Sequence, residues 1–195
     1  MSYDNMLFFC AGPPRSGTAW LSTALNFGAD AFCFHELERD ILDAENLQAV
    51  ADQMIDRMHD MQHMFVGNCS SGLLCFGRIV APLVIIHRDW DEVDVSLQAA
   101  FQEWEKPPTE YDIEDIKKLH EHVCTQNPHA LHVQFEDLFT LESLVQIWRH
   151  CIRLVPPPMD NLREHLRKKI VLKEFNYPWD PKGNLFGIPA AQAND

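Results

Sequence analysis

The sequence predicts an α/β protein, a single domain with a doubly wound, mainly parallel sheet flanked by helices. Short apolar runs alternate with longer segments whose apolar residues recur every three or four positions. One run, PLVIIH at 82–87, is apolar almost throughout, as is typical of a strand covered on both faces. A chain of 195 residues with 46% hydrophobic residues fits one domain, 1–195, whose core needs no disulfide or metal.

The N-terminal part predicts strand, loop, helix and a second strand. MLFFCAG at 6–12 is a short apolar run ended by Gly-Pro-Pro. A helix is expected to begin near Gly17 or Thr18, with Gly28 placed to end it. AFCFHE at 31–36 follows as a strand. The next helix has an apolar face made of Leu47, Val50, Met54, Met58 and Met61.

The middle of the chain continues this alternation. HMFVGNCS at 63–70 predicts a third strand, GLLCFGRI a short apolar helix, and 82–87 a fourth strand. LHVQF at 131–135 alternates apolar and polar residues, as expected of a strand at the sheet edge. Two helices should lie between the strands at 82–87 and 131–135, and Pro107 and Pro108 should stop the first of them. Their apolar faces are Val93, Leu97, Ala100 and Trp104, then Ile116, Leu119 and Val123.

The C-terminal part predicts two further helices and a tail. The first has an apolar face, and Pro156–Pro158 separates it from a basic helix at 162–170. We interpret this basic cluster as a solvated face, with an anion contact as the alternative. The segment 176–195 is a tail rich in Pro and Gly. The apolar face of the first helix is Leu141, Leu144, Val145, Trp148, Cys151 and Ile152.

Composition and charge limit the possible partners and compartment. A formal charge of −13 disfavours a broad nucleic-acid surface, which needs many Lys and Arg residues. No segment approaches the roughly 20 apolar residues of a membrane span, and the start MSYDNMLFFCAG lacks the basic region of a signal peptide. We therefore expect a cytoplasmic protein that contacts no membrane. The six cysteines form no CxxC pair and are expected to be reduced and structural.

The loop AGPPRSGTAWLS, 11–22, joins the first strand to the first helix, where a phosphate-binding loop would stand. Thr18 occupies the position of the usual lysine, and Arg15 is its only cation. Backbone N–H groups and the helix dipole can hold an oxyanion here. The pattern alone is weakly specific, because Gly-Pro turns also serve packing. The missing lysine and the lack of a convincing acidic strand end for magnesium argue against an ordinary NTPase.

The segment PRSGTAWL resembles the 5′-phosphosulfate loop of sulfotransferases, whose usual form is P-[KR]-S-G-T-[TS]. That family has a fold like that of the P-loop NTPases and binds 3′-phosphoadenosine 5′-phosphosulfate (PAPS) without a metal. The resemblance implies that Trp20 lies against adenine, although a core aromatic is the alternative. It also implies that the phosphosulfate is held by Pro14, Arg15, Ser16, Gly17, Thr18 and Ala19.

A second segment, VIIHRDWDEVDVSLQAAF at 84–101, is similar to the family's 3′-phosphate motif. In that motif a strand ends in Arg and a Ser follows eight residues later, here Arg88 and Ser96. An Arg at a strand end and a Ser two turns into the next helix can converge on one phosphate. The alternative is a salt bridge from Arg88 to Asp89, Asp91 or Asp94, with Ser96 a neutral surface residue. FEDL at 135–138 is a weaker echo of the family's YEDL.

The general base is expected in CFHELERD, where His35 and Glu36 end the second strand. Their side chains should point to opposite faces, so that only one enters the cleft. Similarity to tyrosylprotein and carbohydrate sulfotransferases favours Glu36 as the base, with Arg15 stabilising charge on the leaving phosphate. Cytosolic sulfotransferases instead use a later His, which is missing from SSGLLCFG. Ser70 and Ser71 there are weaker candidates for sulfate or substrate binding, and Lys182 is a weak candidate for the 3′-phosphate.

The histidines predict no metal site. His59 and His63 stand four apart on a helix without an evident third ligand, so a solvated pair is expected. His120, His122 and Cys124 would fan around another helix.

The sequence thus predicts a sulfotransferase that moves a sulfuryl group from PAPS to an acceptor hydroxyl or amine. The acceptor could be a small molecule, a carbohydrate or a peptide. An atypical P-loop nucleotide or nucleoside kinase, and a non-catalytic protein that binds PAPS or 3′,5′-ADP, are the alternatives.

Overall fold

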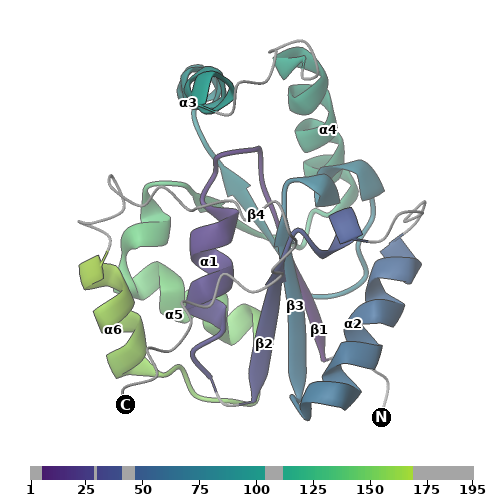
Figure 1. Ribbon diagram of the computed structural model, residues 1–195, viewed down its shortest axis with the longest axis vertical. Helices are drawn as coiled ribbons and strands as arrows, with labels where there is room; N and C mark the ends of the chain where they lie inside the picture. Colours follow the sequence, from purple (N-terminus) through teal and green to yellow (C-terminus); the bar gives the residue numbers. More distant parts are fainter. Residues whose placement is uncertain (1–5, 29, 41–46, 104–111, 169–195) are drawn as a thin grey trace.

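A computed structural model describes residues 6–28, 30–40, 47–103 and 112–168, which form one five-stranded sheet with helices around it (Figure 1). Every neighbouring pair of strands is parallel, in the order β2-β3-β1-β4-β5. The α/β class, the single parallel sheet and the edge position of the last strand are therefore confirmed. The strands are β1 (Leu7–Ala11), β2 (Ala31–His35), β3 (Phe65–Ser70), β4 (Leu83–His87) and β5 (Leu131–Gln134).

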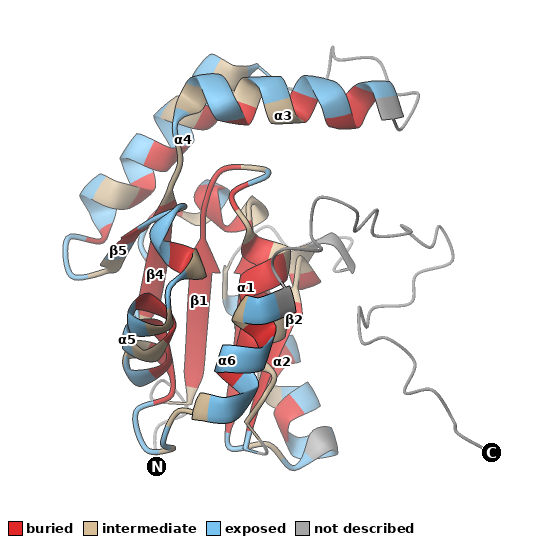
Figure 2. Ribbon diagram, turned by 90° about the vertical axis from the view of Figure 1, so that its left-hand side faces the viewer, coloured by how far each residue is buried: buried red, intermediate tan, exposed pale blue. Residues whose placement is uncertain are grey.

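Helices cover both faces of the sheet, as a doubly wound fold requires (Figures 1 and 2). One face packs against α1 (Thr18–Leu25), α5 (Leu141–Cys151) and α6 (Met159–Lys168). The other packs against α2 (Leu47–Met61), α4 (Ile113–Gln126) and the 3₁₀ helix η3 (Gly72–Phe76). The helix α3 (Trp90–Glu103) lies beyond the carboxyl ends of the strands, and two 3₁₀ helices, η2 (Leu37–Asp40) and η5 (Asp137–Phe139), follow β2 and β5.

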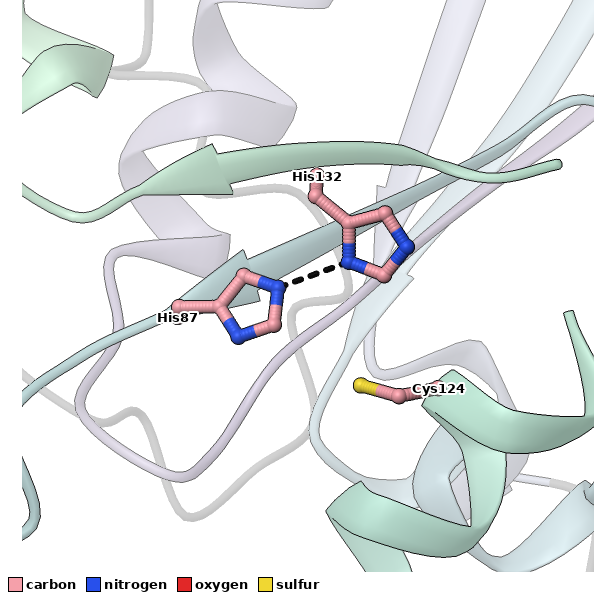
Figure 3. A group of neighbouring side chains, drawn as sticks. All are labelled: His87, Cys124 and His132. Carbon is pink, nitrogen blue, oxygen red and sulfur yellow. Dashed lines mark hydrogen bonds between the residues drawn. The ribbon is translucent and has the colours of Figure 1, made fainter. Parts of the chain in front are cut away.

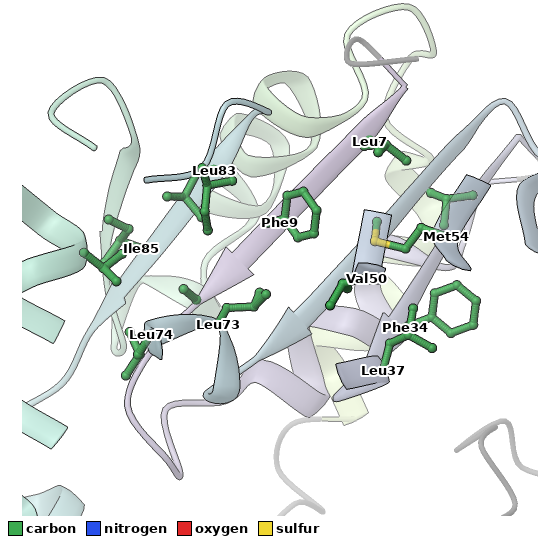
Figure 4. Packing of buried hydrophobic residues seen from close by; sticks show 14 of the residues in the cluster. Leu7, Phe9, Phe34, Leu37, Val50, Met54, Leu73, Leu74, Leu83 and Ile85 are labelled. Atoms are coloured by element: carbon green, nitrogen blue, oxygen red, sulfur yellow. The ribbon is translucent and has the colours of Figure 1, made fainter. Parts of the chain in front are cut away.

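The hydrophobic core has two halves because successive strand residues point to opposite faces. In β1, Leu7, Phe9 and Ala11 belong to the half beneath α2 and η3, shown in Figure 4. Phe8 and Cys10 belong to the half beneath α1 and α5. Each residue of β1 is at most 5% exposed, so this strand is the centre of the molecule.

The end of α1 differs from the expectation. The helix ends at Leu25, and Asn26 is its C-cap. The Asn26 side chain bonds the backbone of Cys33, which holds the end of α1 against β2. Gly28 instead leaves room for Trp148, since a Cβ there would lie 2.6 Å from the indole ring. The proline stop at Pro107 and Pro108, Trp104 and the tail 176–195 lie outside the described residues.

The strand order fixes where a ligand can bind. β1 and β4 are neighbours in the sheet. The chain leaves β1 toward β2 on one side of this pair and leaves β4 toward β5 on the other side. Such a reversal opens a crevice at the carboxyl ends of the two strands, which is where doubly wound proteins bind ligands. The loop after β1 and the segment after β4 therefore meet. No helix in the described ranges is long and apolar enough to cross a membrane.

Candidate functional site

The loop between β1 and α1 has a backbone that only certain residues allow. Arg15 and Gly17 have left-handed φ values of 66° and 83°. A non-glycine residue in this region costs roughly 1–2 kcal/mol, and such strain is concentrated at functional sites. A Cβ on Gly12 would lie 2.4 Å from Ser16 Oγ, so the loop also depends on glycine at its start. Phe135 and Leu138 pack closely against Gly17, because a Cβ there would lie 3.3 Å from Phe135 and 3.2 Å from Leu138.

Two polar features of the loop receive no hydrogen bond from a side chain of the described residues. The Ser16 hydroxyl is fully buried and has no hydrogen-bond partner among the described residues. The first turn of α1 receives no hydrogen bond from a capping side chain, because its N-cap is Gly17. Free N–H groups at a helix start attract anions. The loop therefore has the donors that an oxyanion needs.

The two motifs separated along the sequence meet in space. Arg15 Nε donates to Ser96 Oγ at 3.1 Å, which joins the loop to α3. Arg88, the first residue after β4, donates from Nη1 to the Arg15 carbonyl oxygen. Two guanidinium groups and a hydroxyl thus gather at the crevice between β1 and β4.

The contacts of Arg88 differ from the salt bridge to Asp89, Asp91 or Asp94 that was the alternative to phosphate binding. Its guanidinium carbon lies 4.1 Å from the centre of the Phe135 ring, a cation–π contact. Its Nε lies 3.3 Å from Glu92 Oε2, so the ion pair is with Glu92. Asp89 instead accepts from the N–H groups of Asp91 and Glu92 at the start of α3. Sequence analysis did not identify this contact of Phe135 with Arg88, although Phe135 stands in the FEDL segment.

An open hollow of about 390 Å³ lies beside Arg88 and Ser96. Its lining includes the carboxylates of Asp91 and Glu92 and the apolar side chains of Val95 and Ala99. The Glu92 carboxylate that pairs with Arg88 thus lines the same hollow.

The expectation that His35 and Glu36 point to opposite faces is wrong. Their side chains approach to 4.0 Å between Nε2 and Oε1. The alternation holds for extended backbone, but β2 ends at His35 and Glu36 has a φ of 59°. His35 Nε2 also lies 3.3 Å from Thr18 Oγ1, at the start of α1. Both residues therefore flank the loop.

A second carboxylate in the same segment, Glu38, organises the end of β3. It accepts from Asn68 Nδ2 at 2.7 Å and from the Ser70 hydroxyl. The Ser70 oxygen in turn accepts from the Gly72 N–H at 2.9 Å. Ser70, a weak candidate for sulfate binding, is thus fully buried and already bonded. Sequence reasoning missed Glu38 because its partners lie 30 and 32 residues away.

Trp20 lies in the core and is 7% exposed. Its ring stacks on His165 of α6 at 4.4 Å and lies 4.9 Å from Phe139. These contacts favour the core aromatic, the alternative to adenine stacking. Its indole Nε1 is buried and has no hydrogen-bond partner within the part of the chain that the structure describes.

The remaining histidines fall into separate groups. His63 stacks on Phe32 with 5.8 Å between ring centres. On α4, His120 and Cys124 lie together, 3.8 Å apart, whereas His122 approaches Gly77. Burial, followed by the charges of His120 and His132, lowers the pKa of His87 to about 4, so this ring is neutral at pH 7. Lys182 lies outside the described residues.

Comparison with known proteins supports the fold more than the chemistry. No family model and no curated sequence matches the chain. A sulfotransferase from Alicyclobacillus acidocaldarius is similar in structure, with a TM-score of 0.52 and 13% identity over 85% of this chain and 91% of the other. The chain therefore has a fold like that of a sulfotransferase.

Two other solved structures align less well. A shikimate kinase from Bacteroides thetaiotaomicron gives a TM-score of 0.38 and 14% identity over 76% of this chain and 99% of the other. Retinol dehydratase, in complex with androsterone and the inactive cofactor PAP, gives a TM-score of 0.40 and 15% identity over 84% of this chain and 64% of the other.

Proposed function

We propose that the protein is a PAPS-dependent sulfotransferase that transfers a sulfuryl group to a hydroxyl or amine of a small molecule, carbohydrate or peptide. The observation that carries this proposal is the hydrogen bond from Arg15 to Ser96, 3.1 Å long. It unites the two segments that resemble the 5′- and 3′-phosphate motifs, at the crevice where a ligand of this fold binds. The proposed ligand carries negative groups at both ends, and each segment offers cations or unpaired donors.

Each segment has a distinct role in the proposed site. The N–H groups of the loop 14–19, with the buried Ser16 hydroxyl and Arg15, would hold the 5′-phosphosulfate. Arg88 and Ser96 would hold the 3′-phosphate. Trp20 is left out because its ring is packed in the core. The proposed site uses no metal ion.

Transfer breaks the bond between sulfur and the bridging phosphate oxygen and forms a bond from sulfur to the acceptor oxygen or nitrogen. PAPS supplies the activated sulfuryl group and leaves as 3′,5′-ADP. Arg15 would stabilise the negative charge that gathers on the departing phosphate. Glu36, whose side chain is 20% exposed, would take the proton from the acceptor. His35 Nε2 lies 4.0 Å from Glu36 Oε1 and 3.3 Å from Thr18 Oγ1, so His35 would stand between the base and the start of α1.

Glu92 forms an ion pair with Arg88, so the 3′-phosphate must displace the Glu92 carboxylate in order to bind there. The glutamate side chain is 54% exposed, and exposed ion pairs contribute only about 0.2–1 kcal/mol. A doubly charged phosphate with two bonds to the guanidinium is a stronger partner. The Phe135 ring and the Arg15 carbonyl would keep Arg88 in place during this exchange.

Thermal unfolding with nucleotides tests the proposal. We expect 3′,5′-ADP to raise the melting temperature of the native chain and of Arg163→Ala, which removes a surface arginine of α6. Arg88→Ala should lose most of this shift. Absence of stabilisation, or equal stabilisation of Arg88→Ala and Arg163→Ala, would overturn the assignment.

Two further measurements separate the alternative functions. Stabilisation by ATP with Mg²⁺ but not by 3′,5′-ADP would indicate a kinase. Transfer of labelled sulfate from PAPS to a panel of phenols, sugars and tyrosine peptides tests catalysis. Binding without transfer to any of them would indicate a binding protein.

A further inference from the structure

Three potential metal ligands meet at the edge of the sheet, on the other side of β4 from the phosphate loop. They are His87 at the end of β4, His132 in β5 and Cys124 on α4 (Figure 3). One ligand atom of each lies within 4.8 Å of the other two. No two of them are close in sequence except Cys124 and His132, so the fold creates this group.

The two imidazole rings face each other across neighbouring strands. His87 Nε2 and His132 Nδ1 are 2.8 Å apart and share a hydrogen bond, with ring centres 5.0 Å apart. Around a tetrahedral zinc ion, ligand bonds of about 2.0–2.3 Å place neighbouring ligand atoms roughly 3.3–3.6 Å apart. The two nitrogens, 2.8 Å apart, must separate slightly to bind one ion, and the Cys124 sulfur lies within 4.8 Å of a nitrogen of each ring.

We propose that His87, Cys124 and His132 bind a zinc ion. Two imidazoles and a thiolate form a mixed N₂S set that suits zinc, which tolerates both ligand types and has no rigid geometric demand. His87 and Cys124 are partly buried and His132 is exposed, so a fourth position can be filled by water. This proposal does not rest on the proposed sulfuryl transfer.

His120 holds the Cys124 thiol in place in the metal-free protein. Its Nε2 lies 3.1 Å from the Ile86 carbonyl oxygen, and its Nδ1 lies 3.8 Å from the Cys124 sulfur. When Nε2–H donates to that carbonyl, Nδ1 carries the lone pair and can accept a hydrogen bond from the Cys124 thiol. Zinc binding then displaces this proton to solvent as the thiolate forms. The hydrogen bond between His87 and His132 is replaced by two bonds to the metal.

A bound ion would tie three elements together. β4 and β5 are already paired, and α4 contacts β4 here through His120 Nε2 and the Ile86 carbonyl oxygen. Arg88 follows His87 directly, so the ion would also fix the end of β4 beside the candidate phosphate site.

Zinc titration of the full chain without a histidine tag tests the site. After removal of metals with a chelator, we expect about one Zn²⁺ per chain to bind in competition with a chromogenic indicator. Bound zinc should raise the melting temperature. Co²⁺ as a probe should give a thiolate-to-cobalt charge-transfer band. Cys124→Ser should abolish that band, and His132→Ala should weaken zinc binding about 10-fold or more.

Matched variants keep the test decisive. Cys75→Ser and His122→Ala remove an exposed cysteine and an exposed histidine outside the group, and both should bind zinc like the native chain. Circular dichroism of each metal-free variant checks its folding. Zinc affinity unchanged in Cys124→Ser and His132→Ala, or no stoichiometric binding by the native chain, would overturn the proposal. Loss of zinc with unchanged 3′,5′-ADP binding would leave the proposed transferase function standing.

Discussion

Arg88 is held by three groups that differ in how easily a ligand replaces them. The Arg15 carbonyl and the Phe135 ring fix the guanidinium from within the protein. Glu92 approaches from the solvent side on α3, one turn after the strand end. A phosphate would therefore replace the carboxylate and leave the other two contacts intact.

Replacing Glu92 with glutamine should strengthen binding of 3′,5′-ADP. Glu92→Gln removes the competing charge from Arg88 and lowers the negative potential of the hollow. An exposed ion pair of up to about 1 kcal/mol corresponds to a gain of up to about 5-fold in affinity. Isothermal titration measures it, with Glu114→Gln on α4, another exposed paired glutamate, as control. Weaker binding by Glu92→Gln would mean that the carboxylate positions Arg88 for the ligand.

Replacing Glu36 with glutamine should abolish transfer without abolishing nucleotide binding. A general base contributes about 10²- to 10⁴-fold to rate, so Glu36→Gln should lose this factor once an acceptor is known. The shift in melting temperature with 3′,5′-ADP should equal that of the native chain. Activity within a few-fold of native would show that another group takes the proton, with His35 the neighbour to change next.

At the scale of elements, the centre of the sheet depends on a small residue opposite a large one. Phe8 in β1 is paired in register with Gly67 in β3, and the Phe8 ring is fully buried. A Cβ on Gly67 would lie 1.9 Å from a ring atom of Phe8. Glycine, which ordinarily weakens a strand, is required here because the aromatic ring covers its backbone.

Gly67→Ala should lower the free energy of unfolding by about 1–3 kcal/mol because the ring must move within a packed core. Urea denaturation followed by fluorescence measures the change. In the double variant Phe8→Leu with Gly67→Ala, the smaller side chain leaves room for the methyl group. The effects of the two substitutions should therefore be less than additive. Strict additivity would contradict the contact.

At the scale of the whole molecule, buried thiols link stability to alkaline pH. Cys10, Cys33, Cys69 and Cys151 are buried free thiols in β1, β2, β3 and α5. Burial raises the pKa of all four, that of Cys33 from 9.0 to about 11. In the folded state these thiols keep their protons at pH values where the unfolded chain loses them. The chain should therefore lose stability as the pH rises above about 9, and for Cys33 the loss should continue to about 11.

Urea midpoints measured from pH 7 to pH 11 in reducing buffer test this expectation. Cys33→Ala should have a lower midpoint at pH 7 but a shallower fall above pH 9, because one titrating group is missing. An identical slope in both proteins would assign the alkaline loss to other groups.

The sequence by itself determined the parallel α/β sheet, the order of helices and strands and the position of the two candidate anion-binding segments. These follow from local periods and spacings: apolar runs, three- and four-residue repeats, and the eight residues between Arg88 and Ser96. Helix ends were less certain, because the end of α1 depends on Asn26 reaching the backbone of Cys33.

Only the tertiary structure decided which distant side chains meet. Arg15 and Ser96 touch because β1 and β4 are neighbours whose chains leave in opposite directions. His35 and Glu36 come together because a left-handed residue ends the alternation of the strand. His87, Cys124 and His132 gather because α4 packs at the β4–β5 edge. Contacts between residues tens of positions apart arise from strand order and helix packing, which no local pattern in the sequence encodes.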